Sequence, residues 1–158
     1  GIHQALAAAA GAYAEARLAG HPVIGLIVGL AMSGAFLAHG YQANRLIALD
    51  DPGVMVHAMG KASAARVTLR SVEALEKLAS SVPPMAYDIG NYASLGLLWK
   101  VLRPDEQDLA TVRESLEAAL ADILADPARD LSGRLQGKHR QASRRVRELL
   151  ASQWEDAH

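Results

Sequence analysis

A short segment rich in small residues offers the clearest chemistry in this chain of 158 residues. It begins at Gly29 and contains Met32, Ser33, Gly34 and Ala35. Where a thioester or another carbonyl gains negative charge, two backbone N–H groups aimed at its oxygen form an oxyanion hole. One such donor is worth about 3–4 kcal/mol in enzymes. Glycine at position 34 would let a substrate oxygen approach the backbone closely. The segment is therefore a candidate oxyanion site, and such a site requires no nucleophile.

Two side chains farther along the chain are candidates for supporting roles. His57 precedes Met59 and Gly60 and could deliver a proton; the alternative is an imidazole that is hydrogen-bonded to nearby backbone. Lys61 could attract the phosphate of a substrate arm, whereas isolated lysines are commonly solvated. The six histidines lack the spacing of a metal site, and no carboxylate pair suggests an acid–base couple. No bound metal is expected.

The candidate segment lies in an uncharged run, residues 22–38. Residues 23–28 are β-branched and aliphatic and predict a strand buried on both faces. Gly29 to Gly34 predict a tight turn, and a helix is predicted from Ala35 to Gly40. Such a strand, turn and helix would present free N–H groups to a ligand anion.

Two other interpretations of the run remain open. It could be a membrane helix, which needs about 20 apolar residues. The run is slightly shorter than that, and Pro22 and several glycines interrupt it. The run could also be purely structural, since burying five aliphatic side chains from Val23 to Val28 contributes on the order of 8–15 kcal/mol.

The flanking sequence predicts an α/β core. Residues 2–18 have helical periodicity, and residues 45–49 and 54–57 predict two further short strands. Strands that alternate with helices indicate a crossover unit.

Beyond Met59 the pattern becomes helical. Ser71 is the predicted cap of one helix, and residues 85–102 predict one or two packed helices. A long amphipathic helix is predicted from Pro104 to Pro127, with an apolar stripe made of Leu109, Val112, Leu116, Leu120 and Ile123. A basic helix is predicted over residues 135–154.

Composition excludes several classes of function. The net charge is −1, so no strong field attracts nucleic acid or an anionic membrane. There is no cysteine, which rules out disulfides, thiolate metal sites and a cysteine nucleophile in this chain and fits a cytoplasmic location. The arginines of the last segment could contact nucleic acid or an acidic carrier protein, but neighbouring Glu148 and Glu155 favour a solvated face or a subunit contact.

Four stretches carry a resemblance to a known family. Residues 23–40 resemble the core motif of the crotonase superfamily, and the Ser33–Gly34 pair resembles that of its carboxyltransferase-like branch. More specifically, four stretches look like the gamma subunit of malonate decarboxylase, namely residues 20–29, 31–49, 54–61 and 81–88. The resemblance implies a helix-rich α/β fold with a crotonase-like (ClpP/crotonase) ββα core. It implies that residues 1–103 are the C-terminal part of the carboxyltransferase domain of a longer subunit. Residues 104–158 would be a helical extension packed on the core or on a partner.

The same resemblance implies an activity. Beta and gamma subunits of this family together convert malonyl-S-acyl carrier protein to the acetyl thioester and CO2 through an enolate. Gly34 would be an oxyanion donor with Ser33 and Ala35 beside it. From the residues themselves, we predict His57 as a further catalytic residue and Gly29, Met32 and Lys61 as substrate contacts. A second oxyanion donor is expected from a loop that precedes residue 1.

The expected partners and cofactors follow from that activity. The partners are the beta subunit, the acyl carrier protein and the transferase subunit that serves the carrier, without nucleic acid or membrane. This chain would bind no cofactor itself, because the carrier delivers the phosphopantetheine-type arm. Two alternatives remain: a carboxyltransferase that passes the carboxyl group to biotin, and a non-catalytic scaffold.

Overall fold

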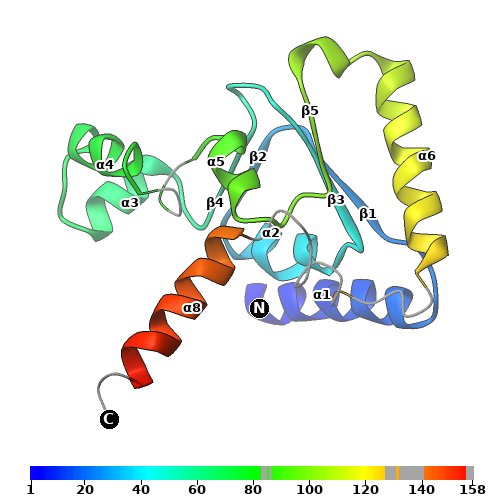
Figure 1. Ribbon diagram of the computed structural model, residues 1–158, viewed down its shortest axis with the longest axis horizontal. Helices are drawn as coiled ribbons and strands as arrows, with labels where there is room; N and C mark the ends of the chain where they lie inside the picture. The colour runs from blue at the N-terminus through cyan, green and yellow to red at the C-terminus, as the bar shows by residue number, and fades with distance from the viewer. Residues whose placement is uncertain (83–84, 86, 127–130, 132–140, 156–158) are drawn as a thin grey trace.

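The computed structural model of the chain describes residues 1–82, 85, 87–126, 131 and 141–155, and shows a helix-rich α/β fold. Figure 1 shows a small twisted sheet with helices around it. The first half of the chain contains α1 (Ile2–Leu18), β1 (Ile24–Ile27), β2 (Leu30–Met32), α2 (Ser33–His39), the 3-10 turn η1 (Gly40–Gln42), β3 (Arg45–Leu49) and β4 (Met55–His57). The second half contains α3 (Lys61–Val67), α4 (Val72–Ala79), α5 (Ile89–Ser94), β5 (Lys100–Leu102), η3 (Pro104–Glu106), α6 (Leu109–Ala125) and α8 (Gln141–Glu155).

All the strand pairs within the two sheets are parallel. The larger sheet has the order β1-β3-β5, in which Ile24 faces Arg45 and Ile47 faces Lys100. The smaller sheet is the pair β2-β4, in which Met32 lies opposite His57. This arrangement confirms the predicted crossover unit, because parallel neighbours need a long connection between them. It also assigns the strand predicted at 54–57 to a second sheet.

The central strand β3 carries the core. Leu46 and Ala48 belong to one apolar cluster, which α5 completes with Ile89 and Tyr92. Ile47 points to the opposite face and contacts Leu102 and Ala119, the latter from α6. Helices thus cover both faces of the sheet, as parallel sheets require. Leu46, Ile47 and Ala48 are 0% exposed.

The uncharged run does not form the predicted elements in full. It contains two short strands and a helix instead of one strand, a turn and a helix. In β1, Ile27 belongs to one apolar cluster, and Ile24 and Leu26 pack against the other, so both faces contact the core as predicted. Only Ile27 is fully buried, and Val28, which follows the strand, is 61% exposed. The predicted turn contains β2, whose residues pair with β4, and the helix begins at Ser33 instead of Ala35.

Other predictions in the first half of the chain were closer. The helix over residues 2–18 and the strand over residues 45–49 are confirmed. So is the helix cap at Ser71, whose hydroxyl oxygen accepts a hydrogen bond from the Ala74 amide at 3.1 Å. Among the helices that the structure describes, none is both long and apolar enough to cross a membrane.

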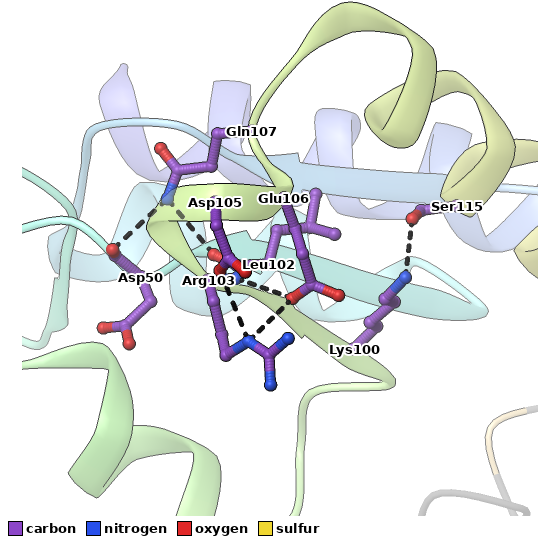
Figure 2. A network of polar contacts seen from close by, with 8 residues as sticks. All are labelled: Asp50, Lys100, Leu102, Arg103, Asp105, Glu106, Gln107 and Ser115. Carbon is purple, nitrogen blue, oxygen red and sulfur yellow. Dashed lines mark hydrogen bonds and ion pairs between the residues drawn. The ribbon is translucent and has the colours of Figure 1, made fainter.

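The segment after residue 85 differs most from prediction. The prediction of one or two helices over 85–102 missed β5, which completes the main sheet beside β3. Polar contacts then connect β5 to the following elements (Figure 2). The Gln107 side-chain amide donates to the carbonyls of Asp50 and Leu102, both at 3.2 Å, and Lys100 Nζ donates to Ser115 Oγ at 2.9 Å.

The long helix begins later than predicted. Pro104 opens only the turn η3, and Asp108 caps α6 through hydrogen bonds from the Ala110 and Thr111 amides at 3.0 Å. The predicted stripe is confirmed at Val112, Leu116 and Ile123, which pack against the core or are buried. It is wrong at Leu109 and Leu120, which are 89% and 39% exposed, and it missed the buried Ala119.

The end of the chain could be compared only in part. Residues 141–155 form α8, which confirms the last predicted helix from residue 141 onward. The earlier part of that prediction, like Pro127, lies outside the described residues.

Candidate functional site

The turn between β2 and α2 is strained. Ser33 has φ 65°, a left-handed conformation that costs a residue with a Cβ about 1–2 kcal/mol. Met32 before it is extended, with φ −110° and ψ 155°, and its side chain does not cap the helix. Ser33 and Gly34 are both exposed. The chain therefore holds an unfavourable backbone geometry at the exposed start of α2, where no side chain caps the helix.

Glycine is not required at position 34 by the packing of the described chain. A Cβ added there would meet only Leu6 Cδ1, at 4.0 Å. Gly34 also has no positive φ, so alanine would fit the backbone. Space near Gly34 is therefore available for another molecule, and a substitution at this position tests contact with that molecule without disturbing the fold.

The strand register brings His57 to the same place. Met32 and His57 are partners at the carboxyl ends of β2 and β4, where ligands commonly bind in parallel α/β sheets. His57 is half-buried, and its Nδ1 accepts a hydrogen bond from the Met59 amide at 3.3 Å. One of the two interpretations of His57, an imidazole bonded to nearby backbone, is thus correct for this nitrogen. The other nitrogen, Nε2, remains for a second role.

Tyr87 is the neighbour of His57 that sequence reasoning did not single out. Its ring stacks on the imidazole with centroids 4.0 Å apart and planes 13° apart. The side chain is only 6% exposed, and its hydroxyl has no hydrogen-bond partner within the described structure. Burial raises the pKa of Tyr87, and the nearby Lys61 charge opposes this only in part. The phenol therefore stays neutral. A tyrosine within the 81–88 stretch was the only available signal.

Lys61 is the first residue of α3 and lies near Tyr87, with its side chain 38% exposed. Its Nζ is 2.8 Å from Glu76 Oε1 and 5.5 Å from the centroid of the Tyr87 ring. The Glu76 carboxylate partly balances the lysine charge. That Lys61 attracts a phosphate stays a prediction. In the structure its ammonium group also lies over the Tyr87 ring.

The predicted site residues do not all lie together. Gly29 stands before β2, where its carbonyl accepts from the Met55 amide at 3.2 Å, whereas Ser33 follows the same strand. Gly29 is therefore at the opposite end of β2 from the strained turn. Met32, Ser33, Gly34 and His57 meet at one end, and Ala35 follows them in the first turn of α2.

A cavity of about 680 Å³ is lined by Tyr87 and by Lys61. Its lining also includes four acidic residues, Asp50, Asp51, Glu76 and Asp88. Neither Ser33, Gly34 nor His57 lines this cavity. Within the described ranges, no group of three histidine, aspartate or glutamate side chains is arranged to hold a metal ion.

Comparison with known proteins identifies the family of this chain. Residues 1–154 match the family described as malonate decarboxylase gamma subunit. The chain belongs to this family. The resemblance inferred from the sequence is confirmed.

Three relatives show how far the similarity extends. A Pseudomonas malonate decarboxylase hetero-tetramer, solved in complex with coenzyme A, contains a chain that is 71% identical over 98% of this chain, with a TM-score of 0.82. A Pseudomonas MdcD-MdcE hetero-dimer of malonate decarboxylase contains one that is 66% identical over 98% of this chain, with a TM-score of 0.77. The malonyl-S-ACP:biotin-protein carboxyltransferase MADD of Malonomonas rubra is 41% identical over 86 residues, or 54% of this chain.

Coverage in the other direction is incomplete. This gamma-subunit chain spans 60% and 59% of the two Pseudomonas chains and 30% of the Malonomonas protein. The transcarboxylase 12S structure with hydrolysed methylmalonyl-coenzyme A is 23% identical, with a TM-score of 0.59 over 80% of this chain and 22% of the other. That similarity shows a shared fold.

Proposed function

We propose that this chain supplies part of the active site of a malonate decarboxylase in which a malonyl thioester on an acyl carrier protein loses CO2. One observation carries the proposal: the strained Ser33–Gly34 turn and His57 meet at the adjoining carboxyl ends of β2 and β4. Membership in the gamma-subunit family supports it. We further propose that the sheet and its helices are a crotonase-like core, completed by the rest of the subunit.

The proposed chemistry needs an electron sink and a proton. The bond between the carboxylate carbon and C2 of the malonyl group breaks, CO2 leaves, and the electron pair moves onto the thioester oxygen as an enolate. The Gly34 amide donates a hydrogen bond to this oxygen, which strengthens as negative charge accumulates there. A proton then adds to C2 to give the acetyl thioester. Ser33 and Ala35 shape the turn, and Met32, Gly29 and Lys61 are proposed substrate contacts.

The proposed assembly follows the solved relatives. We propose a beta-type subunit as the partner that completes the site, because a Pseudomonas relative was solved as an MdcD-MdcE hetero-dimer. The acyl carrier protein would bring the substrate on its phosphopantetheine-type arm, and a transferase subunit would serve the carrier. This chain would hold no cofactor of its own.

Substitution of Gly34 tests this function. The full-length subunit would be assembled with its beta partner, and CO2 release would be followed from a malonyl thioester on the carrier. Gly34→Ala should lower the rate about 100-fold, the effect of losing one oxyanion donor, because the added Cβ displaces the substrate oxygen. Gly34→Val should abolish activity while the complex still assembles.

The matched control is Gly11→Ala, a glycine within α1 whose added Cβ would meet nothing within 4 Å. Both alanine variants should gain about 0.5–1 kcal/mol in helix stability, but only the variant at position 34 should lose activity. An assembled Gly34→Val complex with the full rate would make the turn a scaffold and overturn the proposal.

Carboxyl transfer to biotin is the second candidate, since the Malonomonas relative is a malonyl-S-ACP:biotin-protein carboxyltransferase. The two reactions share the enolate and differ in the fate of the carboxyl group. Release of CO2 at the same rate with and without a biotin carrier supports decarboxylation. Carboxyl found on biotin, without release of CO2, would assign the chain to carboxyltransferases.

A further inference from the structure

We propose that Tyr87 is a positioning residue that, together with the Met59 amide, holds His57 as a neutral hydrogen-bond donor to the reacting thioester. This inference rests on the proposed function and concerns the same end of the β2-β4 pair. It assigns a task to Tyr87 and changes the task expected of His57 from proton delivery to hydrogen-bond donation.

The first step is the protonation state of the imidazole. Nδ1 of His57 accepts a hydrogen bond from the Met59 amide at 3.3 Å. A nitrogen that accepts carries no proton, so in the neutral ring the proton resides on Nε2. Protonating Nδ1 as well would sacrifice this bond and place two donors face to face. The loop that follows β4 therefore selects the tautomer with a donor at Nε2.

The second step is the orientation of the ring. A hydrogen bond to one nitrogen leaves an imidazole free to swing about that contact. The ring of Tyr87 stacks on the imidazole, with ring centroids 4.0 Å apart and ring planes 13° apart. A buried aromatic neighbour of this kind restricts the rotation of the imidazole. Tyr87 is itself confined, being 6% exposed. Lys61 Nζ lies 5.5 Å from its ring centroid and is paired with Glu76.

The third step separates the ring of Tyr87 from its hydroxyl. The hydroxyl has no hydrogen-bond partner in the described structure, so it neither orients the ring nor contacts His57 through a hydrogen bond. Within the Tyr87 side chain, it is the aromatic ring and not the hydroxyl that supports the imidazole. Phenylalanine should therefore replace Tyr87 without loss, whereas an aliphatic residue should not.

The chemical consequence concerns the source of the proton. A neutral imidazole that gave up the Nε2 proton would become a high-energy imidazolate, so His57 keeps its proton and donates a hydrogen bond to the enolate oxygen. Water then supplies the proton that adds to C2. The hydroxide that forms takes up a proton from bulk solvent, which balances the step.

The tautomer can be measured directly in the assembled complex. The full-length subunit, labelled with 15N-histidine and bound to its beta partner, would be studied by magic-angle-spinning NMR, with His57→Gln used to assign the signal. We expect His57 to be neutral, with an unprotonated Nδ1 and a protonated Nε2. A proton on Nδ1, or a mixture of tautomers, would overturn the proposal even if no Tyr87 variant folds.

Paired variants test the positioning role. Tyr87→Phe should keep both the tautomer and the rate. Tyr87→Leu should lower kcat about five- to tenfold, as expected for loss of one aromatic stack, with KM unchanged and the His57 tautomer mixed. An assembled Tyr87→Leu complex with normal kcat would refute the role of Tyr87. Failure of the proposed function would appear differently, as an unaltered rate in the Gly34 variants.

Discussion

The two parallel sheets of this chain differ in how deeply their residues are buried. In β1-β3-β5, the central residues Leu46 to Ala48 are 0% exposed and helices cover both faces. In β2-β4, Leu30 is 69% exposed, and the strand runs into Ser33 with a positive φ. The larger sheet supplies stability, whereas the smaller one holds a strained, open turn.

The difference shows how one chain separates folding from chemistry. Strain at a site persists only when surrounding structure over-determines it, and the packed sheet beside β2 provides that support. A site that binds a substrate also needs surface that folding leaves uncovered. The β2-β4 pair meets this need because its carboxyl ends, at Ser33 and His57, remain accessible or half-buried.

The largest expected difference between the sheets lies in their side chains. Leu46→Ala should destabilise the subunit by about 3 kcal/mol, because it leaves a cavity in the buried cluster. Leu30→Ala, the matched change in β2, should cost less than about 0.5 kcal/mol. Denaturant unfolding of the full-length subunit measures both values. Equal losses would mean that β2 is buried in the subunit and that the contrast between the sheets is an error.

A smaller effect is expected from relieving backbone strain. Ser33→Gly should stabilise the subunit by about 1 kcal/mol, because glycine adopts a positive φ freely. Leu69→Gly is the control, since Leu69 has φ 53° and lies on the surface after α3, away from the sheets. Both gains should appear in thermal unfolding. If only Leu69→Gly raised the stability, the backbone at Ser33 would not be strained.

An effect of similar size is expected in the response of stability to acid. Burial raises the pKa of Asp88, but hydrogen bonds from the side chain and amide of Asn91, with others from the backbone, outweigh it and leave the pKa lowered. A lowered pKa in the folded state means that Asp88 stabilises the protein above its unfolded pKa of about 3.9. This contribution is lost as the pH falls through the folded value.

Removal of the carboxylate checks this sign. Asp88 caps α5 by accepting from the Asn91 amide at 2.8 Å, so Asp88→Ala should cost about 1 kcal/mol at pH 7. The difference from the unsubstituted subunit should shrink below pH 4 in urea unfolding. A difference that grows in acid would contradict the direction of the shift.

Sequence reasoning found the elements that have strong local signals. Helix α1 and strand β3 matched because periodicity and aliphatic runs extend over their full length. Strand β5 was missed because three residues, including the charged Lys100, carry too short a pattern. The stripe of α6 was predicted in part, because Val112, Leu116 and Ile123 do face the core. Leu109 was misplaced because it begins the helix directly after the Asp108 cap, and the buried Ala119 was missed.

The candidate site was predictable in part for the same reason. The Ser33–Gly34 turn is local and visible in the letters of the sequence, although the positive φ at Ser33 is not. The neighbourhood of His57 depends on contacts between distant segments, since its ring stacks on Tyr87 from beyond α4. No local pattern encodes such a pairing. The left-handed serine and the aromatic support of His57 required the structure.

The order of strands also affects how the chain folds while it is being synthesised. Strand β3 occupies the centre of the main sheet, yet its neighbour β5 pairs through residue 100 while β3 itself spans residues 45–49. On the ribosome, β1 and β3 emerge well before β5, so one edge of β3 stays unpaired while α3, α4 and α5 are made. An open edge is a template for pairing with another chain. We therefore expect this edge of β3 to be open to such pairing until Leu102 leaves the exit tunnel.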